Sequence, residues 1–223
     1  MRYSVVIPAY NAAKTINETL EAVLAQTASP ADVIVVDDGS TDNTRHLVED
    51  VGGCVRVLSQ SNSGPGAATN LGMRETDTPL IAMVDADDLW LPHKMHRQIE
   101  YLEANDSCDG VFAQMELFGD RIQGAPIQEG WTRTTMVIRR SVYEEVGDVV
   151  DQPGMLGEMI DWMARARDGG FNLVMLPEVL ARRRVARGTL SDRRDVESNR
   201  GYVIAARAAL LRKRERMQET APQ

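Results

Sequence analysis

The chain has 223 residues, of which 43% are hydrophobic, and this is enough for one large α/β domain with its own core. Its formal net charge of −8 argues against a surface that wraps nucleic acid, because such a surface needs clustered Lys and Arg to neutralise phosphates. Two cysteines are too few for a disulfide framework, and the sequence has no apolar run of about 18 residues that would predict a membrane span. We expect a cytoplasmic protein.

The first half of the chain alternates short β-branched runs with segments of helical period. Strands are predicted in "YSVVIP", "ADVIVVDDGS", "CVRVLS" and "PLIAMV". Helices are predicted after them, over residues 16–27, from Ser40 or Thr41 to about Gly52, after the glycine-rich turn "GPGAATNLGM", and from Pro92 to Ala104. This order is typical of a mostly parallel central sheet, Rossmann-like, with helices on both faces.

The second half has a less regular pattern. "GVFAQMELF" and "WTRTTMVIRR" predict strands, whereas residues 119–130 carry turn residues without a clear period. "SVYEEVGDV" predicts a short helix, "GEMIDWMARARDGGF" a helix stopped by its glycine pair, and residues 195–217 a basic helix. Because no linker or internal repeat interrupts the chain, we expect residues 1–223 to form a single domain.

Two acidic clusters follow predicted parallel strands. Asp37 and Asp38 end the second strand, and Asp85, Asp87 and Asp88 come directly after the fourth. Ligands of parallel α/β sheets bind at the carboxyl ends of the strands, so both clusters should lie at one site. Closely spaced carboxylates suit Mg²⁺ or Mn²⁺, whose remaining positions suit waters and diphosphate oxygens. The alternative for either cluster alone is a tight turn or a helix cap.

The segments "VVIPAYNAAKTINETLEAVLAQT", "VIVVDDGSTDNT", "NSGPGAATNLGM", "MVDADDLWLP" and "MLPEVLARRRV", taken in order, resemble the family-2 inverting glycosyltransferases. The resemblance runs from about residue 3 to residue 191. It implies the glycosyltransferase A-type fold, with a nucleotide-sugar-binding half at 1–106, an acceptor and catalytic half at 107–191 and a C-terminal helical tail at 192–223. It also implies a metal-dependent, hexosyltransferase-like enzyme.

The resemblance carries site roles to particular residues. The "IPAYN" loop, with Pro8, Ala9, Tyr10 and Asn11, matches the loop around the nucleotide, and Asp38 matches the carboxylate that accepts from the base, typically uracil. Asp85 matches the ribose contact, next to Ala86, and Asp87 the ligand of Mg²⁺ or Mn²⁺. Gly64 of the glycine-rich loop and Arg184 of the arginine-rich run are also expected to contact the donor. The alternative for these arginines is an exposed strand with its guanidinium groups in water.

Three positions depart from the family's pattern. Met159 stands where the family usually has its catalytic Asp, Thr69 where it usually has Arg, and Ala186 where it often has His. Methionine cannot accept a proton from the acceptor hydroxyl. We expect Asp161 to be the general base, with Glu158 as the second candidate, because residues three apart share one face of a helix. The alternative is that Glu158 stabilises the helix N-terminus and Asp161 pairs with Arg165.

The sequence thus predicts transfer of a sugar from a nucleotide diphosphate donor, with UDP-sugars preferred, to a hydroxyl acceptor. The resemblance suggests acceptors among glycans, lipid-linked intermediates, small molecules and peptides, in polysaccharide or cell-envelope synthesis. The competing hypothesis is a catalytically impaired nucleotide-sugar-binding or scaffold protein of the same fold. The basic C-terminal segment "RAALLRKRERM" suggests peripheral contact with the inner membrane face, with a homodimer contact or a solvated helix as alternatives.

Overall fold

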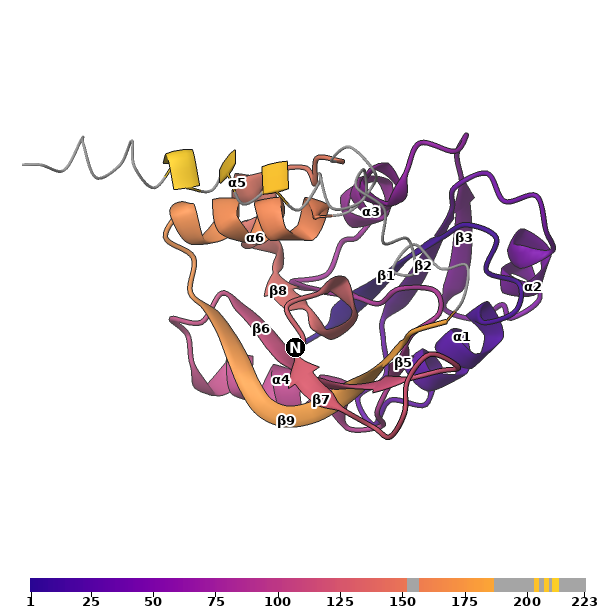
Figure 1. Ribbon diagram of the computed structural model, residues 1–223, viewed down its shortest axis with the longest axis horizontal. Helices are drawn as coiled ribbons and strands as arrows, with labels where there is room; N and C mark the ends of the chain where they lie inside the picture. Colours follow the sequence, from indigo (N-terminus) through magenta and orange to yellow (C-terminus); the bar gives the residue numbers. More distant parts are fainter. Residues whose placement is uncertain (152–156, 187–202, 205–206, 209, 213–223) are drawn as a thin grey trace, which may run out of the picture.

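One nine-stranded sheet runs through the molecule, with strand order β3-β2-β1-β4-β8-β6-β9-β5 and β7 paired to β6 (Figure 1). The computed structural model describes residues 1–151, 157–186, 203–204, 207–208 and 210–212. The strands are β1 (Tyr3–Ala9), β2 (Asp32–Asp37), β3 (Val55–Ser59), β4 (Leu80–Met83), β5 (Leu89–Trp90), β6 (Gly110–Phe118), β7 (Ile127–Glu129), β8 (Val137–Arg139) and β9 (Leu173–Arg184).

The first four strands form the parallel part of the sheet. β1 lies between β2 and β4, and β3 continues the sheet beyond β2, all in parallel register. Both faces of β1 are buried along its whole length, as expected for a strand with helices on either side. The long pair β6 and β9 is also parallel, so most paired residues of the sheet belong to parallel pairs. The fold predicted from the sequence is confirmed.

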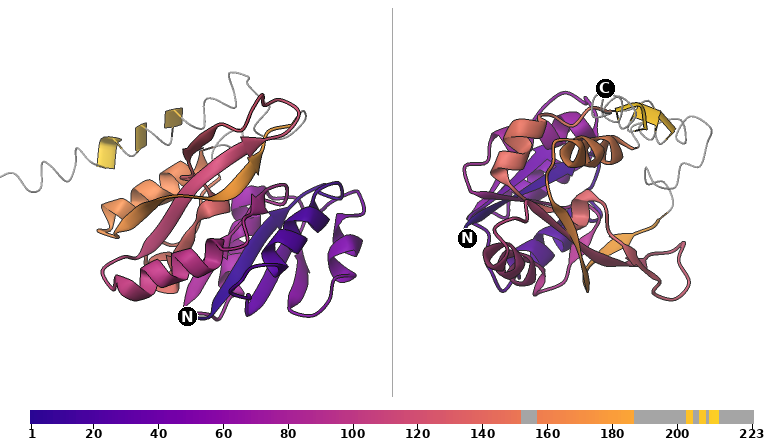
Figure 2. Two further views of the ribbon diagram at one scale, coloured as in Figure 1. Left: turned by 90° about the horizontal axis from the view of Figure 1, so that it is seen from below. Right: turned by 90° about the vertical axis from the view of Figure 1, so that its left-hand side faces the viewer.

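Helices cover both faces of the sheet. They are α1 (Ile16–Leu24), α2 (Thr44–Glu49), α3 (Pro65–Arg74), α4 (Lys94–Ala104), α5 (Arg140–Val146) and α6 (Glu158–Asp168). Val5 and Ile7 of β1 face a core that α1, α2 and α4 close, whereas Val6 between them faces α3, α5 and α6. The two views of Figure 2 show the strong twist of the sheet between these layers.

The second half of the chain differs from the sequence prediction in three places. A strand was predicted throughout residues 131–140, but a single 3₁₀ turn, η1 (Arg133–Thr135), precedes the short β8. Residues 119–130, for which no element was predicted, include β7. The arginine-rich run is part of β9, the long curved orange strand of Figure 1, and its arginines are half-buried. The buried η1 turn explains the first error, because its side chains bond to the site described below.

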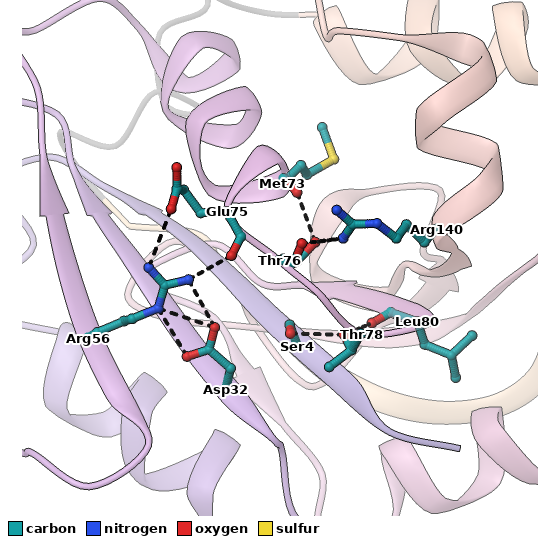
Figure 3. Close-up of polar contacts among 9 residues, drawn as sticks. All are labelled: Ser4, Asp32, Arg56, Met73, Glu75, Thr76, Thr78, Leu80 and Arg140. Atoms are coloured by element: carbon teal, nitrogen blue, oxygen red, sulfur yellow. Dashed lines mark hydrogen bonds and ion pairs between the residues drawn. The ribbon is translucent and has the colours of Figure 1, made fainter.

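Polar side chains tie the elements together at the opposite edge of the sheet, where the parallel strands begin (Figure 3). Arg56 of β3 bonds to the Asp32 carboxylate and to the carbonyl after α3. Thr78 donates to Ser4 at 2.9 Å, and Arg140 of α5 donates to the Thr76 hydroxyl at 2.6 Å. These contacts fix α3 and α5 to the strands at the end remote from the acidic clusters.

The predicted helical tail lies mostly outside the described residues, and those of its residues that the structure describes are helical. The division of the chain at residues 106 and 191 stays a prediction. Among the helices of the described part, none combines the length and the hydropathy needed to cross a bilayer.

Candidate functional site

The carboxyl ends of β1, β2 and β4 meet at one edge of the sheet. Ala9, the last residue of β1, lies opposite Asp37, the last residue of β2, and β4 on the other side of β1 leads into Asp85. The loop after β1 is tied to the loop after β2, because the Asn11 side chain accepts from the backbone of Thr41 at 2.8 Å. Pro8 and Ala9 are buried while Tyr10 is half-exposed. The structure therefore brings the predicted nucleotide loop to the edge of the sheet that carries Asp37, Asp38, Asp85, Asp87 and Asp88, which we call the acidic edge.

Asp38 is buried and organises the loop before α3. Its Oδ1 accepts from Gln60 Nε2 at 2.7 Å and from the backbone of Ser63 at 2.8 Å, and its Oδ2 accepts from the backbone of Gly64 at 2.9 Å. Gly64 has φ of 97°, a conformation that favours glycine. These contacts place Asp38 and Gly64 in one cradle beside the end of β1, and their contacts with the base and the donor stay a prediction.

Asp85 is paired with an arginine that the sequence analysis did not single out. Arg133 of η1 donates from Nε to Asp85 Oδ1 at 2.8 Å, and only 9% of this arginine is exposed. Burial alone would raise the pKa of Asp85, but the Arg133 guanidinium, with a smaller contribution from the charge of Arg183, holds that pKa below its ordinary value. Part of the positive charge that the acidic cluster needs is therefore supplied by the protein itself.

Asp88 is fully buried and structural in its contacts. It accepts from the Thr134 hydroxyl and, at 2.8 Å, from the backbone of Arg184. Its burial, followed by the charges of Asp87 and Asp85, raises its pKa well above the usual range. Asp88 thus joins the end of β4 to η1 and to β9.

Unlike the carboxylate of Asp85, that of Asp87 forms no ion pair with a cationic side chain of the described part of the chain. Burial and the nearby Asp85 carboxylate raise the pKa of Asp87 to about 6. The described residues hold no cage of three or more His, Cys, Asp or Glu. A carboxylate of this kind fits a hard divalent cation that takes its other oxygens from water and a diphosphate, so the residues present suit Mg²⁺ or Mn²⁺ shared with a ligand.

The two candidate bases lie in different surroundings. Glu158 begins α6, is only 5% exposed, and has its Oε1 at 3.0 Å from Nη1 of the same Arg133 that holds Asp85. Asp161 instead pairs with Arg165 at 3.0 Å and with Arg212 at 3.1 Å. Met159 packs in the core between sheet and helices. The structure brings Glu158 to the acidic edge, whereas Asp161 forms ion pairs with Arg165 of α6 and with Arg212 of the C-terminal segment.

The arginines of β9 have separate roles. Arg184 donates from Nε to the backbone carbonyl of Asp87 at 2.9 Å and pairs with Glu18, so it braces the acidic loop. Arg182 and Arg184 both lie over the Phe118 ring, at 4.5 Å and 4.6 Å. Since side chains alternate along a strand, Arg183 lies on the other face of β9, and its charge lowers the pKa of both Asp85 and Asp87. Arg187 lies outside the described residues.

The sequence analysis missed Arg133 and Thr134, and one signal could have found them. "TRTT" is unusual for a buried strand, and an acidic cluster inside a core requires a buried cation. It also missed Asp151, whose carboxylate accepts from the backbone of Gly66 at 2.9 Å and of Ala67 at 3.1 Å. Asp151 therefore joins the segment before α6 to the first turn of α3.

The family model for glycosyl transferase family 2 matches residues 4–141, which is more than half of the chain and includes both acidic clusters. The chain belongs to glycosyl transferase family 2. An uncharacterised glycosyltransferase of Nostoc is 38% identical over 121 residues, or 52% of this chain and 37% of the relative. The Escherichia coli glucosyltransferase WfgD, which is named for UDP-glucose and an α-D-GlcNAc-diphosphoundecaprenol acceptor, is 32% identical over 105 residues, or 46% and 42%. The chain thus spans less than half the length of these two family-2 relatives.

Solved structures show the same fold. TarS of S. aureus (residues 1–349), in complex with UDP-GlcNAc, superposes with a TM-score of 0.79 at 21% identity, covering 95% of this chain and 66% of TarS. The mannosyltransferase PcManGT of Pyrobaculum calidifontis, in complex with GDP-Man and Mn²⁺, superposes with a TM-score of 0.69 at 19% identity, covering 92% and 64%. At these identities the likeness establishes the glycosyltransferase fold of this family-2 chain.

Proposed function

We propose that the protein transfers a sugar from a nucleoside diphosphate donor to a hydroxyl acceptor, with inversion at the anomeric carbon and with a divalent metal. One observation carries the proposal: Arg133 joins Asp85, at the donor edge of the sheet, to Glu158, a carboxylate able to accept a proton. An inverting transfer needs donor binding and a general base side by side, because the acceptor hydroxyl must lose its proton next to the anomeric carbon of the donor.

The nucleotide-sugar donor is proposed to bind along the acidic edge. The Asp38 cradle would take the base, Asp85 the ribose, and Asp87 a divalent ion on the diphosphate. Bound there, Mg²⁺ or Mn²⁺ would offset the negative charge that builds on the departing diphosphate. The Mn²⁺ and GDP-Man bound by PcManGT support the metal, and the UDP-GlcNAc bound by TarS supports a uridine donor.

Arg183 is proposed as the protein's own cation for the diphosphate. It lies near both Asp85 and Asp87, and its charge lowers the pKa of both carboxyl groups. Thr69, at the place of the family's usual Arg, is buried and donates to the carbonyl of Pro65 at 2.7 Å, so it supplies no charge. A guanidinium from β9 would replace that contact.

Glu158 is proposed as the general base in preference to Asp161, which reverses the order expected from the sequence. Burial raises the pKa of Glu158 above its ordinary value, and the Arg133 charge opposes that rise. A somewhat raised pKa suits a base that must accept a proton near neutral pH. The carboxylate of Asp161 is already engaged in ion pairs with two arginines, Arg165 and Arg212.

A lipid-linked glycan intermediate is the acceptor class that we propose. The support is the name of the relative WfgD, whose acceptor is a sugar on diphosphoundecaprenol. Synthesis of a cell-envelope polysaccharide would follow from such an acceptor.

Turnover of nucleotide sugars by purified protein, with and without Mn²⁺, tests the proposal. We expect UDP-sugar turnover that stops on chelation, is lost in Asp87→Asn and Glu158→Gln, and persists in Asp161→Asn and in Asp106→Asn, an exposed carboxylate. Loss in Asp161→Asn with Glu158→Gln active would reverse the assignment of the base. The anomeric configuration of the product, read by NMR, tests inversion. Nucleotide binding without any turnover would instead favour the scaffold role that Met159 at the usual base position suggests.

A further inference from the structure

We propose that Arg133 is a positioning residue that keeps the Glu158 carboxylate ionised and fixed beside Asp85, so that the base is ready when the donor binds. This inference rests on the proposed function, since it takes Glu158 as the base. Arg133 itself need not touch either substrate. Its single guanidinium would hold two carboxylates with different roles, Asp85 on the donor side and Glu158 as the base.

The geometry of Arg133 allows this double contact. Nε donates a hydrogen bond to Asp85 Oδ1 at 2.8 Å, whereas Nη1 lies 3.0 Å from Glu158 Oε1 as an ion pair without hydrogen-bond geometry. The Arg133 and Glu158 side chains are 10% and 7% exposed, which leaves little water to screen the pair. Asp85 follows β4 and Glu158 begins α6, two elements far apart in the chain. Arg133 therefore sets the distance between the donor side and the base.

The backbone that carries Arg133 is itself anchored on both sides. The Thr134 hydroxyl donates to Asp88, and the Thr134 carbonyl accepts from Trp90 Nε1 at 2.7 Å. The carbonyl of Thr135 accepts from Gln98 Nε2 at 2.8 Å. Each of these partners is buried, so the η1 turn is held in place by β5, α4 and the acidic loop together. A cation on this turn keeps its position without a ligand.

The charges around Glu158 explain why Arg133 affects its protonation state. In the described part of the chain, the charges that act most strongly on Glu158 are those of Arg133 from η1, Asp85 from the end of β4, and Asp151 from the segment after α5. Burial raises the pKa of Glu158, and both aspartates raise it further. Arg133 is the larger of two influences that act in the opposite direction, the other being a backbone hydrogen bond to the Glu158 carboxylate. Without Arg133, that hydrogen bond is left to oppose burial and both aspartates, which favour a protonated Glu158 that cannot serve as a base.

The test compares pH–rate profiles of wild type, Arg133→Gln and Arg133→Lys. We expect the acidic limb of kcat to move upward by one pH unit or more in Arg133→Gln, which corresponds to about a tenfold loss per unit below that limb. Arg133→Lys, which restores the charge, should recover most of the shift. Arg165→Gln, which disrupts a different ion pair of α6, serves as the structural control and should leave the limb in place.

A uniform loss of rate at all pH values in Arg133→Gln, with the limb unmoved, would overturn the inference while leaving the proposed function intact. If wild type itself shows no turnover, the proposed function fails, and a double-mutant cycle still tests the pair. Melting temperatures of wild type, Arg133→Gln, Glu158→Gln and the double variant should then be non-additive, because Glu158→Gln removes the unpaired charge that Arg133→Gln leaves buried. Additive effects in that cycle would overturn the inference.

Discussion

The Asp38 carboxylate and the backbone N–H of Gly64 lie 2.9 Å apart, and this contact joins the end of β2 to the start of α3. With the further bonds from Gln60 and Ser63, both oxygens of Asp38 face only donors. A residue proposed to recognise the nucleotide base therefore also shapes the loop around it.

Asp38→Asn should destabilise the fold and weaken nucleotide binding together. The Asn amide replaces one of the two carboxylate oxygens with an NH₂ group. In either orientation this group faces an N–H donor, so at least one buried donor loses its acceptor, at a cost of about 1–3 kcal/mol. Asp37→Asn is the matched control, because the Asp37 side chain accepts from the backbone of Ser40 at 3.2 Å and the amide oxygen can keep that bond. Urea denaturation of the two variants measures the difference. Equal stabilities would show that the Asp38 cradle does not hold the loop.

Arg183→Ala should weaken binding of UDP about tenfold or more while changing binding of uridine little, because a charge-assisted contact to phosphate contributes about 1.5–3 kcal/mol. Arg182→Ala is the control on the same strand, since Arg182 pairs with Glu116 at 2.8 Å and lies over Phe118. Isothermal titration with UDP and uridine separates the diphosphate from the base. The assignment is wrong if Arg182→Ala loses UDP affinity and Arg183→Ala keeps it.

Most of the fold could be predicted because the local pattern and the tertiary role agree in the first half of the chain. The apolar runs that become β1, β2 and β4 are buried on both faces, and the period of three and four in α1 matches its buried residues. In residues 131–140 the local pattern and the tertiary role disagree. Arg133 and the threonines have strand-like neighbours, but their side chains are held by distant residues, which no local pattern reports.

The acidic clusters could be predicted as one site because carboxyl ends of parallel strands converge by topology. The choice between Glu158 and Asp161 as the general base could not be predicted from the sequence. It depends on which arginine each carboxylate meets, and Arg133 is 25 residues before Glu158 while Arg212 is 51 residues after Asp161. Helical spacing gave the third contact, between Asp161 and Arg165, as the alternative to a catalytic role of Asp161, and the structure has this contact.

Lys94→Met should raise the free energy of unfolding near pH 7. Lys94 is fully buried, with Nζ 4.0 Å from the centre of the Trp90 ring and 3.7 Å from Met95 Sδ, and burial lowers its pKa well below the usual range. The unfolded chain therefore binds a proton that the folded chain excludes, so wild-type stability rises with pH between the folded pKa and the unfolded pKa of about 10.4.

The advantage of Lys94→Met should accordingly shrink as the pH approaches 10. Lys14→Met, at an exposed position, is the control and should change stability little at either pH. Urea denaturation at pH 7 and pH 10 measures both variants. A Lys94→Met protein less stable than wild type at both pH values would mean that the contact with Trp90 outweighs the cost of burial.

Gly72→Ala should destabilise the protein although alanine favours a helix by about 0.5–1 kcal/mol over glycine. A Cβ at Gly72 in α3 would lie 2.3 Å from Cγ1 of Val6 in β1 and 3.2 Å from Cγ2 of Val36 in β2. Overpacking of this kind costs about 1–3 kcal/mol, because neither strand can move away from its neighbours in the middle of a parallel sheet. Adding Val6→Ala removes the nearer methyl groups, so the double variant should be more stable than the sum of the two single effects. Urea denaturation of all four proteins gives this coupling, and strictly additive losses would show that α3 can shift outward from the sheet.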